Sequence, residues 1–229
     1  MRDRRPIVAI DGPAGAGKST VTKRVARALN YTQVDTGALY RALAWACGER
    51  GVSWDDGDAV ARVARDLAAP GVVKMSVAQD QTRVFVHERD VSDEIRTRHV
   101  AHGASIVSQI PKVREHLLDI QRALGARGGV VLEGRDIGTV VFPDAEAKFY
   151  LTATAEVRAA RRQGELAQKG EPPELADILA EVKERDLRDT MRPIAPLTQA
   201  PDAIVVDSSR MNIDQVVDFI VSHVRSLEG

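Results

Sequence analysis

The sequence has little of several features that would each indicate a class of protein. It contains one cysteine, Cys47, which excludes an internal disulfide and a cysteine-based zinc site. No apolar run approaches the roughly 20 residues that a membrane helix needs, and no apolar signal core follows the basic first residues. A net charge of −1 excludes a broadly basic surface for nucleic acid. We therefore expect a cytoplasmic protein that binds neither nucleic acid nor a membrane.

The rest of the composition is typical of a globular protein. The 229 residues are 44% hydrophobic and 28% charged, which is enough to form one domain with an insertion. Cys47 lies in an apolar stretch, so we interpret it as a small buried helix residue. His99 and His102 have no obvious acidic or cysteine companions, so a metal pair is not expected there.

The most informative segment is GPAGAGKST, residues 12–20. It fits the pattern G-x-x-x-x-G-K-[ST], in which backbone N–H groups and a helix N-terminus surround a polyphosphate. The apolar spacing predicts a buried strand at 7–11 and a helix at 18–29, the context that this pattern requires. Lys18 is expected to reach the β and γ phosphates, and the Ser19 hydroxyl to ligate Mg²⁺. The chain is therefore expected to bind a nucleoside triphosphate.

Short apolar strands alternate with helices along most of the chain. The expected strands are residues 7–11, 32–35, 129–133, 147–151 and 203–206. Because helices connect them, the pattern predicts an α/β fold with a five-stranded parallel sheet and helices on both faces.

Two segments interrupt this alternation. β-forming residues at 72–77 and 82–87, separated by the polar residues 78–81, predict an antiparallel hairpin. We therefore assign 71–110 as a small antiparallel β insertion. Two strongly charged helices are expected between residues 155 and 190.

Polar motifs follow two of the predicted strands, at the edge where ligands of open α/β sheets bind. DTGALYR (35–41) places Thr36 and Arg41 there, and an arginine fork matches phosphate oxygens. The alternative for this motif is a polar helix cap with a surface arginine. EGRDIGT (133–139) offers Glu133 as a carboxylate for the outer shell of Mg²⁺, with a salt-bridged turn as the alternative.

Two clusters of charged residues are spaced to share a helix face. They are Arg158, Arg161 and Arg162 at i, i+3 and i+4, and Arg185, Asp189 and Arg192 at i, i+4 and i+7. Solvated faces paired with neighbouring glutamates are one interpretation. The other is a mobile lid that brings guanidinium groups onto phosphates, because phosphoryl transfer depends on positioning and charge neutralisation.

Taken in order, the phosphate loop, DTGALYR, the inserted hairpin, EGRDIGT and the helix KERDLRD resemble bacterial-type cytidylate kinases, a family of nucleoside monophosphate kinases. The resemblance covers essentially the whole chain and includes VSDEIRT, KVREHLL and TVVFPDA. It implies a single P-loop kinase unit over 1–229, with 71–110 as the monophosphate-binding insertion and 155–190 as the helical lid. It also implies ATP and Mg²⁺ as cofactors and CMP and dCMP as substrates, and we expect a monomer.

The resemblance implies roles for residues that match the motifs of the family. ATP is expected to bind Gly12, Pro13, Ala14, Gly15, Ala16, Gly17, Lys18, Ser19 and Thr20. The CMP phosphate is expected to bind Arg41, Arg135 and Arg192, cytosine to bind Ser105, Arg114 and Asp136, and the sugar to bind Thr36, Arg185 and Asp189. Catalysis is expected to depend on Lys18, Arg41, Arg135, Arg158 and Arg192. Two positions depart from some relatives, which have serine in place of Thr36 and aspartate in place of Glu133.

Two other functions remain as alternatives. A kinase for UMP, AMP or shikimate is the nearest one, and the residues that contact the base distinguish these acceptors. A nucleotide-dependent switch such as a small GTPase is the second, although guanine-specific switches usually carry an N-K-x-D segment that this chain lacks. The arginines suit a second anionic substrate better than a protein partner. We therefore expect ATP-dependent phosphorylation of CMP and dCMP.

Overall fold

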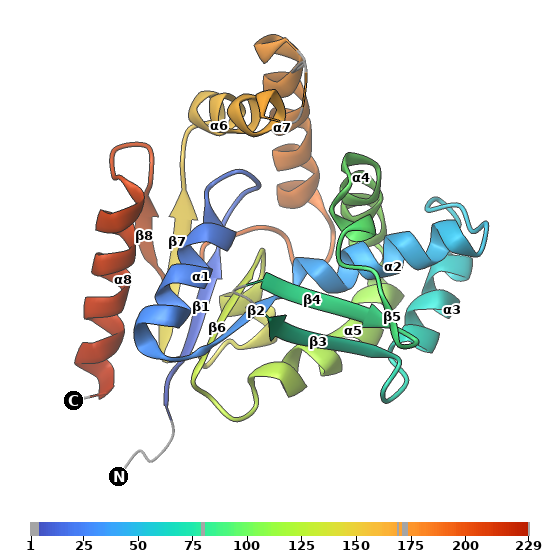
Figure 1. The fold of residues 1–229 in the computed structure, drawn as a ribbon, viewed down its shortest axis with the longest axis horizontal. Helices are drawn as coiled ribbons and strands as arrows, with labels where there is room; N and C mark the ends of the chain where they lie inside the picture. The colour runs from blue at the N-terminus through green and yellow to red at the C-terminus, as the bar shows by residue number, and fades with distance from the viewer. Residues whose placement is uncertain (1–4, 79–80, 169, 171–173, 229) are drawn as a thin grey trace.

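The computed structural model describes residues 5–78, 81–168, 170 and 174–228. At its centre is a five-stranded sheet with the order β2-β6-β1-β7-β8 (Figure 1). The strands are β2 (Thr32–Asp35), β6 (Val130–Gly134), β1 (Ile7–Asp11), β7 (Ala147–Thr152) and β8 (Ile204–Asp207). All neighbouring strands are parallel. The sheet predicted from the sequence is confirmed, and no strand end differs from its prediction by more than one residue.

Helices cover both faces of this sheet because the strands are apolar on both sides. The helices are α1 (Lys18–Leu29), α8 (Ile213–Glu228) and α5 (Pro111–Gly125). Val8 and Ile10 of β1 pack in a cluster with residues of α1 and α8. Ile7 and Ala9 belong to a second cluster that includes leucines of α5. Successive strand residues point to opposite faces, so β1 is buried along its whole length.

The predicted hairpin is confirmed as part of a second, antiparallel sheet. Its strands are β3 (Val73–Ala78), β4 (Gln81–Val86) and β5 (Arg89–Asp90). Residues 79–80, in the expected polar break, lie outside the described part of the chain.

This small sheet packs with helices from within the segment 71–110 and from both sides of it. The helices are α2 (Gly37–Glu49), α3 (Gly57–Leu67), α4 (Arg98–Val107) and α5, with a short 3₁₀ turn, η1 (Glu94–Arg96), before α4. Their apolar residues and those of β4 form one hydrophobic cluster that runs from Ala38 to Leu117. The hydrophobic cluster around the small sheet therefore extends beyond residues 71–110. The bounds of the insertion stay a prediction.

Helix α4 was not expected from the sequence. The Thr97 side chain accepts a 3.3 Å hydrogen bond from the Val100 N–H and so caps its first turn. Gly103 lies against the Trp54 ring, where a Cβ would come within 2.4 Å of the indole. A glycine in the middle of a helix lowers the helix propensity of the segment, so the sequence does not indicate a helix here. The packing against Trp54 explains why a glycine occupies this position.

Two charged helices, α6 (Ala155–Ala167) and α7 (Leu175–Met191), lie at the end of the molecule toward which β7 points (Figure 1). Helix α7 ends before Arg192, whose backbone is extended, as expected for a residue that precedes proline. After β6 the chain makes a π-helical turn, η2 (Ile137–Val141), which the sequence did not indicate. In the described part of the chain, no helix combines the length and apolarity needed to cross a bilayer.

Candidate active site

The loop between β1 and α1 has the shape that the phosphate-loop pattern predicts. Gly12 has φ 147°, and a Cβ there would lie 1.9 Å from the Leu151 carbonyl oxygen, so only glycine fits. Gly17 has φ 93° and precedes α1, whose N-terminus has no side-chain cap. Open N–H groups at a helix N-terminus attract anions. The loop therefore has the geometry of a phosphate site.

Lys18 is buried beside this loop. Its Nζ donates 2.7 Å hydrogen bonds to the carbonyl oxygens of Gly12 and Pro13. Burial and the neighbouring Arg135 lower the pKa of the Lys18 ammonium, although Glu133 opposes them. An ammonium held by neutral carbonyls in a desolvated place interacts strongly with an arriving phosphate.

Ser19 and Glu133 form the corner where Mg²⁺ is expected. The Ser19 hydroxyl donates a 2.8 Å hydrogen bond to Glu133 Oε2, although the two residues are 114 positions apart. Burial, with Asp35 nearby, raises the pKa of Glu133 to about 7. Its Oε1 is buried and has no hydrogen-bond partner among the described residues. Mg²⁺ is coordinated by oxygen atoms, and a hydroxyl and a carboxylate with a free oxygen both supply them. The residues present therefore fit this ion.

Helix α6 brings two of its three arginines to the phosphate loop. Arg158 donates to the Ala14 carbonyl at 3.0 Å and pairs with Asp186 of α7. Arg161 donates to the carbonyl oxygen of Ser208 at 2.7 Å and reaches that of Ala16 at 3.5 Å. The third, Arg162, is exposed and pairs with a glutamate one turn along, at 3.2 Å. The helix therefore presents Arg158 and Arg161, and not Arg162, to the loop.

A second group of charged side chains lies past the ends of β2 and β6. We call it the arginine–aspartate cluster; its members are Arg41, Arg114, Arg135, Arg185, Arg192, Asp35, Asp136 and Asp189. The hydrogen-bonded ion pairs within it are Arg41–Asp35 (2.6 Å), Arg135–Asp189 (2.8 Å), Arg192–Asp136 (3.2 Å) and Arg114–Asp136. These residues come from the end of β2, from α2, α5 and α7, and from the segments after β6 and α7, so the fold assembles a site from distant positions.

The cluster carries more positive than negative charge. Five arginines against three aspartates leave a formal excess of two positive charges. Burial, with Arg135 nearby, lowers the pKa of Arg185 to about 10. Burial alone would raise the pKa of Asp189, but Arg135 and Arg185 outweigh it and hold that pKa below its usual range. An excess of two positive charges matches a phosphate monoester, which carries about −1.5 to −2 at pH 7.

Three donors at this site are buried without a hydrogen-bond partner among the described residues. They are the Nε atoms of Arg41 and Arg185 and the hydroxyl of Ser105 in α4. Buried polar groups are normally hydrogen-bonded, so these three donors are available to a ligand. The Thr36 hydroxyl, in contrast, already donates to the Glu133 carbonyl oxygen at 2.8 Å.

The structure thus brings together most of the residues predicted from the sequence, and it adds several that were missed. Asp35 was considered only as a helix cap; it accepts the Ala38 N–H at 3.2 Å and also pairs with Arg41. Asp186, which pairs with Arg158, lies inside the KERDLRD motif and could have been found as a counterion for the lid arginines. Asp11 was not singled out, although it ends a buried strand directly before the phosphate loop.

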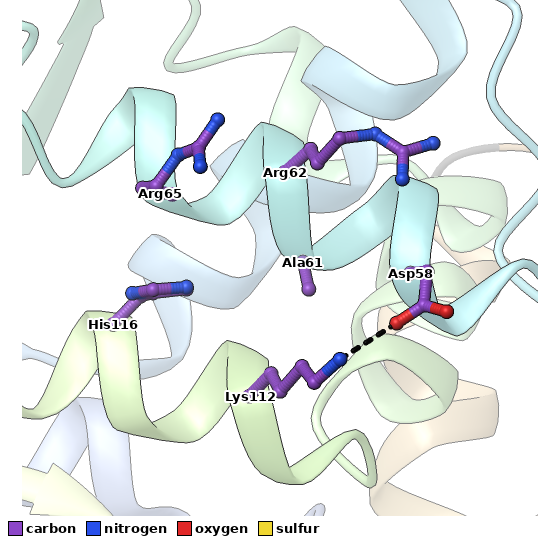
Figure 2. A pocket seen from close by; sticks show the side chains of 6 residues that line it. All are labelled: Asp58, Ala61, Arg62, Arg65, Lys112 and His116. Carbon is purple, nitrogen blue, oxygen red and sulfur yellow. Dashed lines mark hydrogen bonds and ion pairs between the residues drawn. The ribbon is translucent and has the colours of Figure 1, made fainter.

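Cys47 and His99 have structural surroundings. Cys47 is fully buried in α2, and the His99 ring packs 4.7 Å from the Trp54 ring, as expected for structural side chains. A surface pocket of about 220 Å³ between α3 and α5 contains none of the predicted site residues (Figure 2). Figure 2 shows its Lys112–Asp58 ion pair, 2.8 Å long, bridging the two helices.

Comparisons with known proteins agree with this geometry. The profile of the cytidylate kinase family matches residues 8–226. A cytidylate kinase of Citrifermentans bemidjiense is 46% identical over 227 residues, which cover 98% of this chain and 95% of that protein. A cytidylate kinase of Methylococcus capsulatus is 45% identical and covers 99% of this chain and all of its own length.

Among solved structures, an uncharacterized protein from Eubacterium ventriosum is similar with a TM-score of 0.54 at 12% identity. The match covers 97% of this chain and 99% of that one. At this identity the likeness supports the fold alone. The family profile and the two close relatives carry the assignment, and they show that this chain belongs to the cytidylate kinase family.

Proposed function

We propose that the chain transfers the γ-phosphoryl group of ATP to the phosphate of CMP or dCMP, which yields ADP and CDP or dCDP. The observation that carries this proposal is the position of the arginine–aspartate cluster beside the phosphate loop. Glu133 joins the two, since its side chain accepts from Ser19 and its carbonyl oxygen accepts from Thr36. A triphosphate site and a second anion site therefore lie at the same edge of the sheet.

On the ATP side, residues 12–20 bind the triphosphate and Lys18 neutralises the β and γ phosphates. Ser19, with Glu133 behind it, is proposed to hold Mg²⁺. When bound, this ion neutralises charge on the phosphates and orients them. Arg158 and Arg161 approach the same loop from α6 and add positive charge where the transferred group becomes most negative.

On the acceptor side, Arg41, Arg135 and Arg192 are proposed to hold the phosphate of CMP. The acceptor oxygen is already an anion, so no general base is needed. The task of the site is to align this oxygen with the γ-phosphoryl group and to exclude water, which would otherwise hydrolyse ATP. Thr36, Arg185 and Asp189 are proposed to hold the sugar.

The base is proposed to bind Ser105, Arg114 and Asp136. Cytosine presents an N4 amino donor beside the N3 and O2 acceptors, whereas uracil presents an O4 acceptor beside an N3–H donor. The hydrogen-bonded pair Arg114–Asp136 offers a donor next to an acceptor. This order suits cytosine, while uracil would place like groups against each other. A site built for one pattern can discriminate against the other by roughly 10⁴.

The proposal also includes a closing movement. Residues 71–110 and 155–190 are proposed to move toward the phosphate loop when both nucleotides bind, because clustered arginines repel one another until phosphate arrives. The monomeric state and the cytoplasmic location remain expectations from the sequence.

The test is an ADP-release assay with ATP and one acceptor at a time: CMP, dCMP, UMP, AMP or shikimate. We expect fast turnover with CMP and dCMP and much slower turnover with the other three. Faster turnover with AMP or shikimate would contradict the assignment of the acceptor. Slow ATP or GTP hydrolysis that no acceptor accelerates would instead favour a nucleotide-dependent switch.

A further inference from the structure

Asp11 is a buried carboxylate at the junction between the phosphate loop and the acceptor site. It is the last residue of β1, directly before Gly12, and only 5% of it is exposed. Its Oδ1 accepts the Ile137 N–H at 2.8 Å, and its Oδ2 accepts the Gly138 N–H at 2.7 Å. Both partners belong to η2, the turn that immediately follows Arg135 and Asp136.

We infer that Asp11 is a positioning residue, which fixes the turn carrying Arg135 and Asp136 relative to the phosphate loop. The inference rests on the proposed function, because it assigns those two residues to CMP. Asp11 forms no hydrogen bond with an arginine of the cluster; its two hydrogen bonds go to the backbone. It therefore acts on the acceptor site through the position of η2, beside an electrostatic interaction with Arg135.

We call the two hydrogen bonds between the Asp11 carboxylate and η2 the tether. The need for it follows from where the sheet ends. The pairing of β1 with β6 runs from Ile7 opposite Val130 to Asp11 opposite Gly134. In the described part of the chain, the ladder pairs of β6 end at Gly134, yet the next two residues contact CMP in the proposed function. The Asp11 side chain extends the connection between these strands past the last ladder pair.

The local backbone shows what the tether holds. Asp136 has φ −148° and ψ 27°, outside both helix and strand, and the following turn is π-helical. Turns of this kind are rare and are frequently found at functional sites. Burial raises the pKa of Asp11 to about 6, and the N–H groups of Gly138 and Ile137 oppose this rise. A carboxylate kept in such an unfavourable place is held by these two hydrogen bonds.

Substitution Asp11→Asn tests the inference with almost no change in size. The amide oxygen can accept one N–H group, while the amide nitrogen is a donor that faces the other. We expect kcat/KM for CMP to fall by about 10- to 10²-fold, the scale of a small misplacement of binding groups. Equilibrium binding of a non-hydrolysable ATP analogue, measured without CMP, is expected to change much less than the CMP kinetics, because both hydrogen bonds of Asp11 go to η2 and only its charge acts on Lys18.

Glu146→Gln is the matched control. Glu146 is also a carboxylate that accepts a backbone N–H, from Ile7 at 2.9 Å, but at the opposite end of β1. This variant is expected to keep the CMP kinetics of the unaltered protein. Equal losses in the two variants would overturn the inference and indicate a general loss of stability.

Gly138→Ala gives an independent test if Asp11→Asn does not fold. A Cβ at Gly138 would lie 3.4 Å from Asp11 Oδ2 and 3.2 Å from Lys148 Cδ, so it crowds the same contact from the other side. A loss of CMP affinity with unchanged ATP-analogue binding would support the inference. Equal weakening of both ligands, or no change, would overturn it. The unaltered protein is assayed alongside: without CMP turnover there, the proposed function itself fails, which separates the two outcomes.

Discussion

The cations on the two sides of the site are held by different partners. Around the phosphate loop the partners are mostly backbone carbonyls, as Lys18 shows with its two 2.7 Å hydrogen bonds. In the arginine–aspartate cluster the partners are carboxylates, as in the pairs Arg135–Asp189 and Arg192–Asp136. Arg158 is intermediate, since it contacts both the Ala14 carbonyl and Asp186.

This difference separates two tasks. A carbonyl carries only a partial charge, so an arriving triphosphate can take over Lys18 without breaking a hydrogen-bonded ion pair. A carboxylate holds its arginine in one orientation and hydrogen-bonds it, at the cost of cancelling part of its charge. The phosphate loop thus offers charge to a highly charged ligand, whereas the cluster offers fixed geometry to a ligand that must be selected.

The largest effect is expected at the phosphate loop. Lys18→Ala removes the cation proposed to neutralise the transferred group, and losing one such contact typically costs about 10²–10³ in turnover. The measurement is kcat for ADP formation with CMP, together with circular dichroism to establish folding. Lys112→Ala, which removes an exposed lysine from the surface pocket in Figure 2, is the control and should keep full activity. A folded Lys18→Ala variant with near-normal turnover would remove this lysine from the mechanism.

A smaller and more selective effect is expected in the cluster. Asp136→Ala removes the acceptor proposed to face the amino group of cytosine, and a good bidentate contact to a base is worth about 1–3 kcal/mol. The ratio of kcat/KM for CMP to that for UMP should fall by roughly 5- to 150-fold, mainly through loss of CMP activity.

Asp189→Ala is the control for this ratio. Asp189 is also a buried carboxylate paired with an arginine of the cluster, but it is proposed to hold the sugar. Its loss should lower the activity with CMP and UMP alike and leave the ratio unchanged. If Asp136→Ala also left the ratio unchanged, another residue would select the base, and Asp136 would serve only to hold Arg114 and Arg192.

The comparison also shows what the sequence could and could not predict. The phosphate loop was predictable because its residues are contiguous and its chemistry is local. The arginines of the cluster were identified, but their pairing was not, because partners such as Arg135 and Asp189 are 54 positions apart. The tether from Asp11 to η2 spans 126 positions and ends on backbone N–H groups, which leave no trace in side-chain patterns. Helix α4 was missed because Gly103 lowers the helix propensity of its segment. The reason for this glycine, the Trp54 ring packed against it, becomes visible only in the fold.

The smallest expected effect concerns stability at the junction between the two sides. Burial raises the pKa of Asp11 from 3.8 to about 6, despite the N–H groups that it accepts. The folded protein therefore binds a proton more tightly than the unfolded chain, so this contribution to stability is present below pH 3.8 and is lost as the pH rises through about 6. Between pH 5 and 7 the loss amounts to about 1 kcal/mol for this one group.

Urea unfolding at pH 5, 6 and 7 measures this effect. Glu133, whose pKa is raised to about 7, acts in the same direction, so the unaltered protein alone cannot separate the two carboxylates. Asp11→Asn removes one of them. The free energy of unfolding of the unaltered protein should fall by about 1 kcal/mol more over this range than that of the variant. Parallel curves would mean that Asp11 remains ionised throughout, so that its two N–H partners, and not its burial, set its charge. The tether would then be equally strong from pH 5 to 7, which would extend the fixed geometry of the acceptor side to the start of the phosphate loop.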